Sequence, residues 1–286
     1  MTPMSGAFDW LAVGDIAAER SAGDDHTLGG AAARLAAHGA TLGARLALVG
    51  KVGDDEPGHR LRDTLRRLKV DLRWLATAAG TPTTFWEEPD GPPQQRRVER
   101  GADLALRLDE LPPPSVGASL TVVSGYSLSV EPARSAVLGA LAGARARGGR
   151  PALLLEAELL WWTNPRMTRR LLEPALAAAD SVALSAADAG ALFGPVENRQ
   201  AIRLLAELGP RLIYFAETDG SVLLREAGRI QRCPAASPTR PPRDRLAGPA
   251  AFWVGLARGL PPQKAVAQSI RYAQSARRSG VVRTRV

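Results

Sequence analysis

Short apolar runs alternate with longer stretches of helical periodicity along most of this chain, and no other feature restricts the fold as much. We expect strands over residues 8–14, 45–50, 120–125, 151–155, 181–184 and 211–216. We expect helices over 31–38, with Gly39 as its C-terminal cap, and over 57–69, 131–147, 167–179, 187–193 and 199–207. Regular strand–helix alternation favours an α/β fold, in which helices cover both faces of a mainly parallel sheet. We expect a single domain over residues 1–286.

One segment breaks the alternation. Residues 81–101 are polar, hold four prolines and alternate like short exposed strands. This pattern predicts an antiparallel lid inserted into the α/β body. Residues 233–249 are rich in Pro and Arg, and we expect them to be the least regular part of the chain.

Composition and charge exclude several classes of protein. The net charge of +8 comes from 34 Arg and 3 Lys against 29 acidic residues, and the arginines are scattered among the acids. Because no basic stripe alternates with aromatic residues, we expect no nucleic-acid partner. No apolar run approaches the roughly 20 residues of a membrane helix, and residues 1–14 lack the basic region of a secretory signal, so we expect no membrane partner and a cytoplasmic location. The single Cys233 excludes an intramolecular disulfide and a cysteine-based zinc cluster.

The common phosphate, metal and nucleophile motifs are absent. The sequence has no Gly-x4-Gly-Lys-Ser/Thr loop, no Gly-x-Gly-x-x-Gly after the first strand, no His-Glu-x-x-His and no Gly-x-Ser-x-Gly. The three histidines, His26, His38 and His59, are isolated from one another, which favours surface or loop positions. The chain is therefore not a P-loop protein, and its histidines form no recognisable metal site.

Several other motifs occur in a fixed order. Gly29-Gly30 opens the first predicted helix, residues 50–58 read Gly-Lys-Val-Gly-Asp-Asp-Glu-Pro-Gly, and Ala251-Phe252 lies at the start of a C-terminal helix. In this order and spacing the chain resembles the ribokinase-like (PfkB) carbohydrate kinases over nearly its whole length. The resemblance implies a three-layer ribokinase-like fold with a small β lid over a sugar. It also implies phosphoryl transfer from ATP, with magnesium, to a sugar or nucleoside hydroxyl, and a homodimer formed through the lid.

The resemblance also implies which residues form the site. The implied substrate contacts are Asp15, Glu19, Gly29, Gly30 and Arg34. The implied phosphate and nucleotide contacts are Gly220, Asp244, Ala247 and Gly248, and the implied metal contact is Asp188. Two glycines before a helix let the backbone approach a ligand closely and aim free N–H groups at it, although the same pair also suits a simple tight turn.

The resemblance fails where the chemistry is expected. The family's Asp-Thr-x-Gly-Ala-Gly-Asp motif aligns without gaps onto residues 244–250, which places Ala250 at the general-base position. Ala250 has no proton acceptor, and Pro249, at a glycine position, has no N–H to offer a phosphate. Loss of a general base alone costs about 10²–10⁴ in rate. Further departures replace the family's residues by Glu19, Arg34, Glu156, Asp188 and Glu217.

Two functions therefore stay open. The favoured hypothesis is a pseudokinase, which descends from a sugar kinase, has lost or strongly reduced its activity and binds a sugar-like ligand, with or without ATP and magnesium. Its support is Ala250, Pro249 and Glu217, whose carboxylate would repel ATP phosphates. The alternative is a competent small-molecule kinase with a non-standard base. Two features stay undecided between ligand contact and a structural role, namely Trp161-Trp162 and the tip of the lid at residues 94–97.

Overall fold

The computed structural model describes residues 8–20, 26–87, 97–156, 164–236 and 244–279. Among them, the larger sheet contains β1 (Phe8–Val13), β4 (Leu46–Gly53), β5 (Leu75–Ala78), β8 (Ala118–Ser124), β9 (Arg150–Leu154), β10 (Ser181–Ser185), β11 (Leu212–Ala216), β12 (Val222–Glu226) and β13 (Arg229–Cys233). Their order is β13-β12-β11-β10-β9-β8-β1-β4-β5. The strands from β11 to β5 are parallel, and β12 and β13 add an antiparallel edge.

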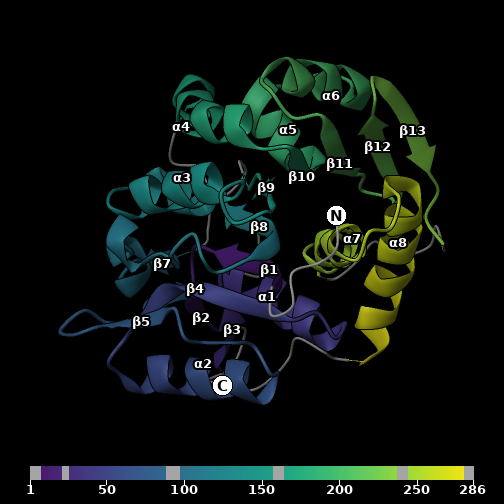
Figure 1. The fold of residues 1–286 in the computed structure, drawn as a ribbon. Coiled ribbons are helices and arrows are strands. Elements are labelled where there is room, and N and C mark those ends of the chain that lie inside the picture. Colours follow the sequence, from purple (N-terminus) through teal and green to yellow (C-terminus); the bar gives the residue numbers. More distant parts are fainter. Residues whose placement is uncertain (1–7, 21–25, 88–96, 157–163, 237–243, 280–286) are drawn as a thin grey trace.

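Helices cover both faces of this sheet (Figure 1). Neighbouring residues of a strand point to opposite faces, so Trp10 and Ala12 belong to one hydrophobic core, and Leu11 and Val13 belong to the other. The first core is closed by α1 (Ala31–Thr41), α2 (Glu56–Arg67), α7 (Ala247–Ala257) and α8 (Pro262–Ser279). The second is closed by α3 (Ala133–Gly143), α4 (Pro165–Ala178), α5 (Ala186–Phe193) and α6 (Asn198–Glu207). The predicted α/β fold with a mainly parallel sheet is confirmed.

A smaller sheet lies beside the larger one. It contains β3 (His26–Gly29), β2 (Ala17–Arg20), β6 (Thr84–Glu87) and β7 (Arg97–Glu99), in that order. Residues 81–101 supply only β6 and β7, and the other two strands come from the segment between β1 and α1. The sheet is also not purely antiparallel, because β2 runs parallel to β6. The sequence therefore located half of the lid, since β2 and β3 are too short to carry a clear periodicity of their own.

Some predicted boundaries are wrong. Gly39 does not cap α1, which continues to Thr41, and a Cβ at Gly39 would lie 2.5 Å from the indole of Trp10. This glycine therefore serves close packing between α1 and β1. Helix α3 is shorter at both ends than the predicted 131–147. The segment 233–249, expected to be irregular, includes the first three residues of α7, the third of which is Pro249.

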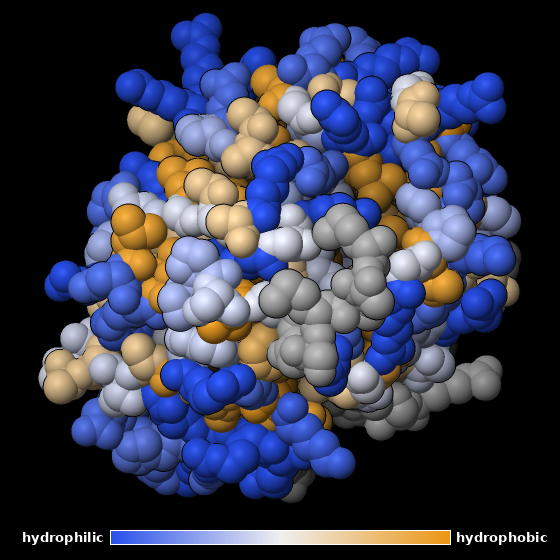
Figure 2. All heavy atoms as spheres, viewed as in Figure 1, coloured by the Kyte–Doolittle hydropathy of each residue, from blue (hydrophilic) through white to orange (hydrophobic). Residues whose placement is uncertain are grey.

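The surface in Figure 2 is mainly hydrophilic, with hydrophobic residues scattered between polar ones. Among the described residues, the large hydrophobic side chains that are exposed are Leu108 and Met167. None of the helices described here is both long enough and apolar enough to cross a bilayer. The apolar residues are thus used almost entirely in the two cores.

Candidate functional site

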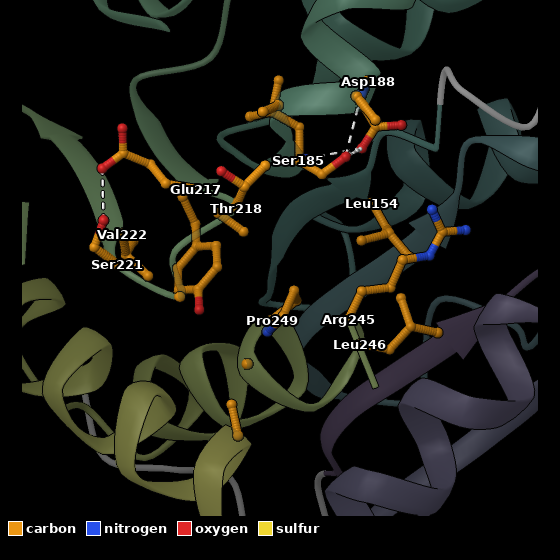
Figure 3. A pocket seen from close by; sticks show the side chains of 18 of the residues that line it. Leu154, Ser185, Asp188, Glu217, Thr218, Ser221, Val222, Arg245, Leu246 and Pro249 are labelled. Atoms are coloured by element: carbon orange, nitrogen blue, oxygen red, sulfur yellow. Dashed lines mark hydrogen bonds between the residues drawn. The ribbon is translucent and has the colours of Figure 1, made fainter. Parts of the chain in front are cut away.

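A cavity of about 250 Å³ opens at the carboxyl ends of β9, β10 and β11, beside the first turn of α7 (Figure 3). Ligands of open α/β sheets bind at this edge, because the loops that follow parallel strands converge there. The structure brings Asp188, Gly220 and Gly248 to its wall, as the sequence predicted, together with Pro249. Among the described residues, its charged lining consists of Glu156, Asp188, Glu217 and Arg245.

The turn from β11 to β12 forms one wall of the cavity. Gly220 adopts φ 84° in this turn, a conformation that favours glycine. Glu217 accepts hydrogen bonds from Ser221 Oγ at 2.6 Å, Asn198 Nδ2 at 3.0 Å and Arg232 Nε at 3.0 Å. Burial works against the charged carboxylate, but these hydrogen bonds outweigh it and hold the pKa of Glu217 below its usual value. A negative charge therefore lines this wall at neutral pH.

Asp188, the predicted metal contact, has a structural task. Ser185 is the N-cap of α5, and its Oγ accepts the Asp188 N–H at 3.1 Å. In return, Asp188 Oδ2 accepts the N–H and the hydroxyl of Ser185, each at 2.8 Å. This reciprocal capping box satisfies the first turn of the helix. The described residues contain no group of three or more His, Cys, Asp or Glu side chains placed to hold a metal ion.

The first turn of α7 offers few donors to an anion. The Ala247 N–H bonds to Asp244 O at 3.3 Å, and the Ala250 N–H bonds to Leu246 O at 3.0 Å. Pro249 has no N–H. Ala247 and Ala250 are fully buried and are not among the described residues that line the cavity. A Cβ on Gly248 would lie 2.5 Å from Tyr214 Oη, so only glycine fits there without displacing the tyrosine.

Asp244 belongs to a network that joins residues from both ends of the chain. Arg34 Nη2 lies 2.8 Å from Asp244 Oδ1, and His38 Nε2 lies 2.9 Å from Asp244 Oδ2. His38 Nδ1 lies 3.0 Å from Tyr272 Oη. Burial opposes the charge of Asp244, but Arg34 and His38 hold the pKa of this carboxyl well below its usual range. The expectation that His38 lies on a surface or in a loop is wrong, because its side chain is completely buried within this network.

The other predicted substrate contacts lie near the start of α1. Asp15 Oδ2 accepts the Ala31 N–H at 2.8 Å, so this buried carboxyl satisfies the first turn of the helix. Gly30 has φ 79°, and a Cβ there would lie 2.6 Å from Asp15 O. Glu19, on β2, lies 4.0 Å from Arg34 through Oε2 and Nη1. The diglycine thus allows a close approach of backbone to backbone, in addition to any role toward a ligand.

Glu156 lines the cavity, although the motifs of the sequence did not predict it as a site residue. It lies two residues beyond the end of β9, is 3% exposed and has φ 47°, which is uncommon for a residue with a side chain. Ser124 Oγ donates to Glu156 Oε2 at 2.7 Å. Burial, together with the nearby Asp15, raises the pKa of Glu156 to about 8. An acid placed directly after a buried parallel strand was the signal that could have identified it.

Two of the undecided features fall outside the described residues. Trp161-Trp162 lies there, as does the lid tip at residues 94–96. The choice between ligand contact and a structural role therefore stays open for them.

Comparison with known proteins identifies the family. A sequence model of the pfkB family carbohydrate kinases matches residues 17–279. The chain is 32% identical over 212 residues to a fructokinase of Klebsiella pneumoniae, a match that covers 72% of this chain and 69% of that enzyme. It is 30% identical over 147 residues to a 5-dehydro-2-deoxygluconokinase of Shouchella clausii, covering 49% of this chain and 45% of the relative.

Solved structures show the same fold. The aminoimidazole riboside kinase of Salmonella enterica, crystallised with aminoimidazole riboside and an ATP analogue, superposes with a TM-score of 0.82 at 22% identity, over 96% of this chain and 94% of that one. The fructokinase of Vibrio cholerae, crystallised with fructose, ADP and calcium, gives a TM-score of 0.80 at 22% identity, over 96% and 93% of the two chains. The ribokinase-like fold with a small lid sheet is thereby confirmed. This chain belongs to the pfkB family of carbohydrate kinases.

Proposed function

We propose that this pfkB-family protein has lost, or strongly reduced, phosphoryl transfer to a sugar hydroxyl and acts as a pseudokinase. The observation that carries the proposal is Ala250. It stands where the family alignment puts the general base, and it is fully buried with its N–H in a helical hydrogen bond. A methyl group there accepts no proton, and the loss of a base costs about 10²–10⁴ in rate.

The environment for a triphosphate supports the same proposal. Phosphates bind helix N-termini through several free N–H groups. In α7, Pro249 has none, and the amides of Ala247 and Ala250 already have partners. The residues present therefore do not fit magnesium-bound ATP well, and we derive no catalytic step through it.

A sugar-like ligand remains part of the proposal. The relatives named above are kinases of fructose and other small carbohydrates, and the α1 entrance with its diglycine is retained here. Glu19 and Arg34 replace the residues through which the family would recognise a sugar. We therefore propose a ligand of this class without naming the sugar, because both side chains present a different pattern of donors and acceptors.

A competent kinase is the second candidate, and Glu156 favours it. This carboxyl lies in the cavity wall, and its pKa of about 8 is suited to accepting a proton near neutral pH. In this alternative Glu156 would be the group that takes up the proton of a substrate hydroxyl. Such an activity would rise as pH increases toward 8, as Glu156 ionises.

Release of ADP tests the first proposal. The wild-type protein, Ala250→Asp and Ala250→Asp with Pro249→Gly are incubated with magnesium, ATP and a panel of hexoses, pentoses and nucleosides. We expect no release above background from wild type and a gain from the double variant. Ala251→Asp is the matched control, because it buries the same side chain about 100° further round the helix. Circular dichroism checks that each variant is folded, and wild-type turnover at about 1–10³ s⁻¹ would refute the proposal.

Glu156→Gln separates the two candidates. Glutamine keeps the size of the side chain and its hydrogen bond with Ser124 but cannot take a proton. If wild type releases ADP and Glu156→Gln does not, the second candidate is supported. If wild type is inactive at every pH from 6 to 9, it is excluded.

A further inference from the structure

The cavity beside α7 has a mostly apolar wall. More than half of the described residues that line it are apolar, among them Tyr214 and Val222 from the sheet and Ile270 and Ala273 from α8. Its volume of about 250 Å³ is below the roughly 300–1,000 Å³ of pockets that hold drug-sized ligands. The space between sheet and helix therefore suits one small ring system.

The polar part of the wall consists mainly of hydrogen-bond acceptors. Figure 3 shows Glu217, Thr218, Ser185 and Asp188 along the side of the cavity opposite Pro249. Ionised carboxylates accept hydrogen bonds and donate none, so they select ligands that carry hydroxyl or amino groups. A phosphate, which is itself an acceptor with negative charge, meets repulsion at the same positions.

The cationic part of the lining is small. Arg245 is the one basic residue among the described residues that line the cavity, and it is already close enough to Glu156 to favour that group's charged form. Arg232 approaches this wall through Glu217 and Asp219, whose charges it balances at 3.0 and 2.5 Å. Neither guanidinium compensates for the amides that the first turn of α7 fails to provide.

From this lining we infer that the cavity binds an uncharged nucleoside-like ligand, a flat ring that carries hydroxyl and amino donors, and discriminates against the corresponding nucleotides. The ring would lie against the apolar side chains, and its donors would meet Glu217 and Asp188. The inference rests on the proposed loss of phosphoryl transfer, because that proposal leaves the cavity beside α7 without magnesium-bound ATP. It goes further by naming the chemical class of that ligand.

Calorimetric titration tests the order of affinities. Adenosine, guanosine, cytidine and uridine are titrated first, and the tightest is then compared with its mono-, di- and triphosphate, with and without magnesium. We expect the nucleoside to bind best and the affinity to fall with added phosphates, by roughly tenfold or more over the series. A triphosphate that binds more tightly than its nucleoside would overturn the inference. So would the absence of binding by all four nucleosides at about 1 mM, a concentration at which even weak sites are occupied.

Two pairs of variants test whether the nucleoside binds in this cavity. Glu217→Gln removes a charge from the wall, and we expect it to narrow the gap between nucleoside and triphosphate, whereas Glu207→Gln makes the same change on the exposed surface of α6 and should leave the gap unchanged. Ala187→Trp places a large ring at the exposed edge of the cavity and should abolish nucleoside binding at unchanged melting temperature. Gln200→Trp, on the surface of α6, is its control. Equal effects within a pair would contradict the placement of the ligand.

The outcomes distinguish this inference from the proposed function. An inactive protein that binds no nucleoside overturns the ligand class alone. A protein that releases ADP rapidly overturns the proposed function, whatever the calorimetry shows for nucleosides.

Discussion

Arg34 Nη2 lies 2.8 Å from Asp244 Oδ1, and this ion pair joins α1 to the segment that leads into α7. The two side chains are only 20% and 16% exposed, so the pair is largely shielded from solvent. Within a kinase alignment both positions belong to the ligand site. Here the cation and the anion satisfy each other, with His38 as a third member. A ligand at this point would compete with an internal salt bridge for the same groups.

Asp244→Asn should destabilise the protein by about 3 kcal/mol at pH 7, because it removes the nearer carboxylate, at 2.8 Å, of a largely buried arginine and leaves it only Glu19 at 4.0 Å. Urea unfolding measures the change. The charge of Asp244 contributes its full stabilisation above the unfolded-state pKa, near 3.8, and this stabilisation is lost as the pH falls further. The difference in unfolding free energy between variant and wild type should therefore narrow progressively below pH 4. Asp109→Asn, which breaks an exposed pair with Arg107, should have no measurable effect. Equal losses of stability for the two variants would show that the Arg34–Asp244 pair stabilises the fold no more than an exposed ion pair does.

Glu156 should make stability fall as pH rises. The folded-state pKa, about 8, exceeds the unfolded value, so between pH 4.5 and 8 the folded protein holds a proton that the unfolded chain has lost. Burial raises the pKa of Asp15 as well, which acts in the same direction. Each pKa unit corresponds to about 1.4 kcal/mol. We therefore expect the free energy of unfolding of Glu156→Gln, relative to that of wild type, to increase by about 2 kcal/mol or more between pH 5 and pH 9.

Chemical unfolding at several pH values checks this. The control is Glu173→Gln, which changes an exposed carboxylate on α4 and should leave the slope of stability against pH as it is. A parallel pH dependence of wild type and Glu156→Gln would contradict the buried, protonated carboxyl.

Gly30→Ala should cost at least about 3 kcal/mol. Two effects add, since the positive φ of 79° disfavours a side chain by about 1–2 kcal/mol and the new Cβ would lie 2.6 Å from Asp15 O. Gly228→Ala isolates the first effect, because Gly228 has a similar φ of 81° and no atom within 4 Å of the added Cβ. We expect about 1 kcal/mol for this control in thermal unfolding. If both variants lose the same stability, the close approach at Gly30 is relieved by a backbone shift.

Asp188→Ala should lower stability by about 1 kcal/mol through loss of the α5 capping box. Ser185→Ala should cost a similar amount, and the double variant less than the sum, because both substitutions remove the same reciprocal hydrogen bonds. Magnesium should leave these differences unchanged. A melting temperature that rises with magnesium and nucleotide in wild type, but not in Asp188→Ala, would instead assign the carboxylate to metal binding.

The periodicity of the chain predicted the large sheet well, because burial of alternate strand residues and of helix faces is a local pattern. It predicted the lid only in part. β6 and β7 lie in a segment of distinctive composition, whereas β2 and β3 are four residues each, and β2 contains Ala17-Ala18-Glu19, which has no strand signal. The pairing of β2 with β6, across more than 60 residues of chain, is a product of tertiary contacts.

Some of the residues that the motifs named lie close together in the folded chain. Asp188, Gly220, Gly248 and Pro249 do meet at one cavity, although they lie on three separate segments. His38 was wrongly expected on a surface or in a loop because it is isolated in sequence from the other histidines. Its partner Asp244 is 206 positions away, a separation that no local pattern spans.

The residue types alone determined that position 250 carries no titratable group and that position 249 has no N–H, because this holds for alanine and proline in any fold. Only the tertiary structure decided the charge states of the acids nearby. Packing of α1 against α7 pairs Asp244 with Arg34 and His38. The chain beyond β9 buries Glu156 near Asp15, and Glu156 keeps its proton at neutral pH. Charge state depends on burial and on partners from distant segments, and these distances exist only once the chain is folded.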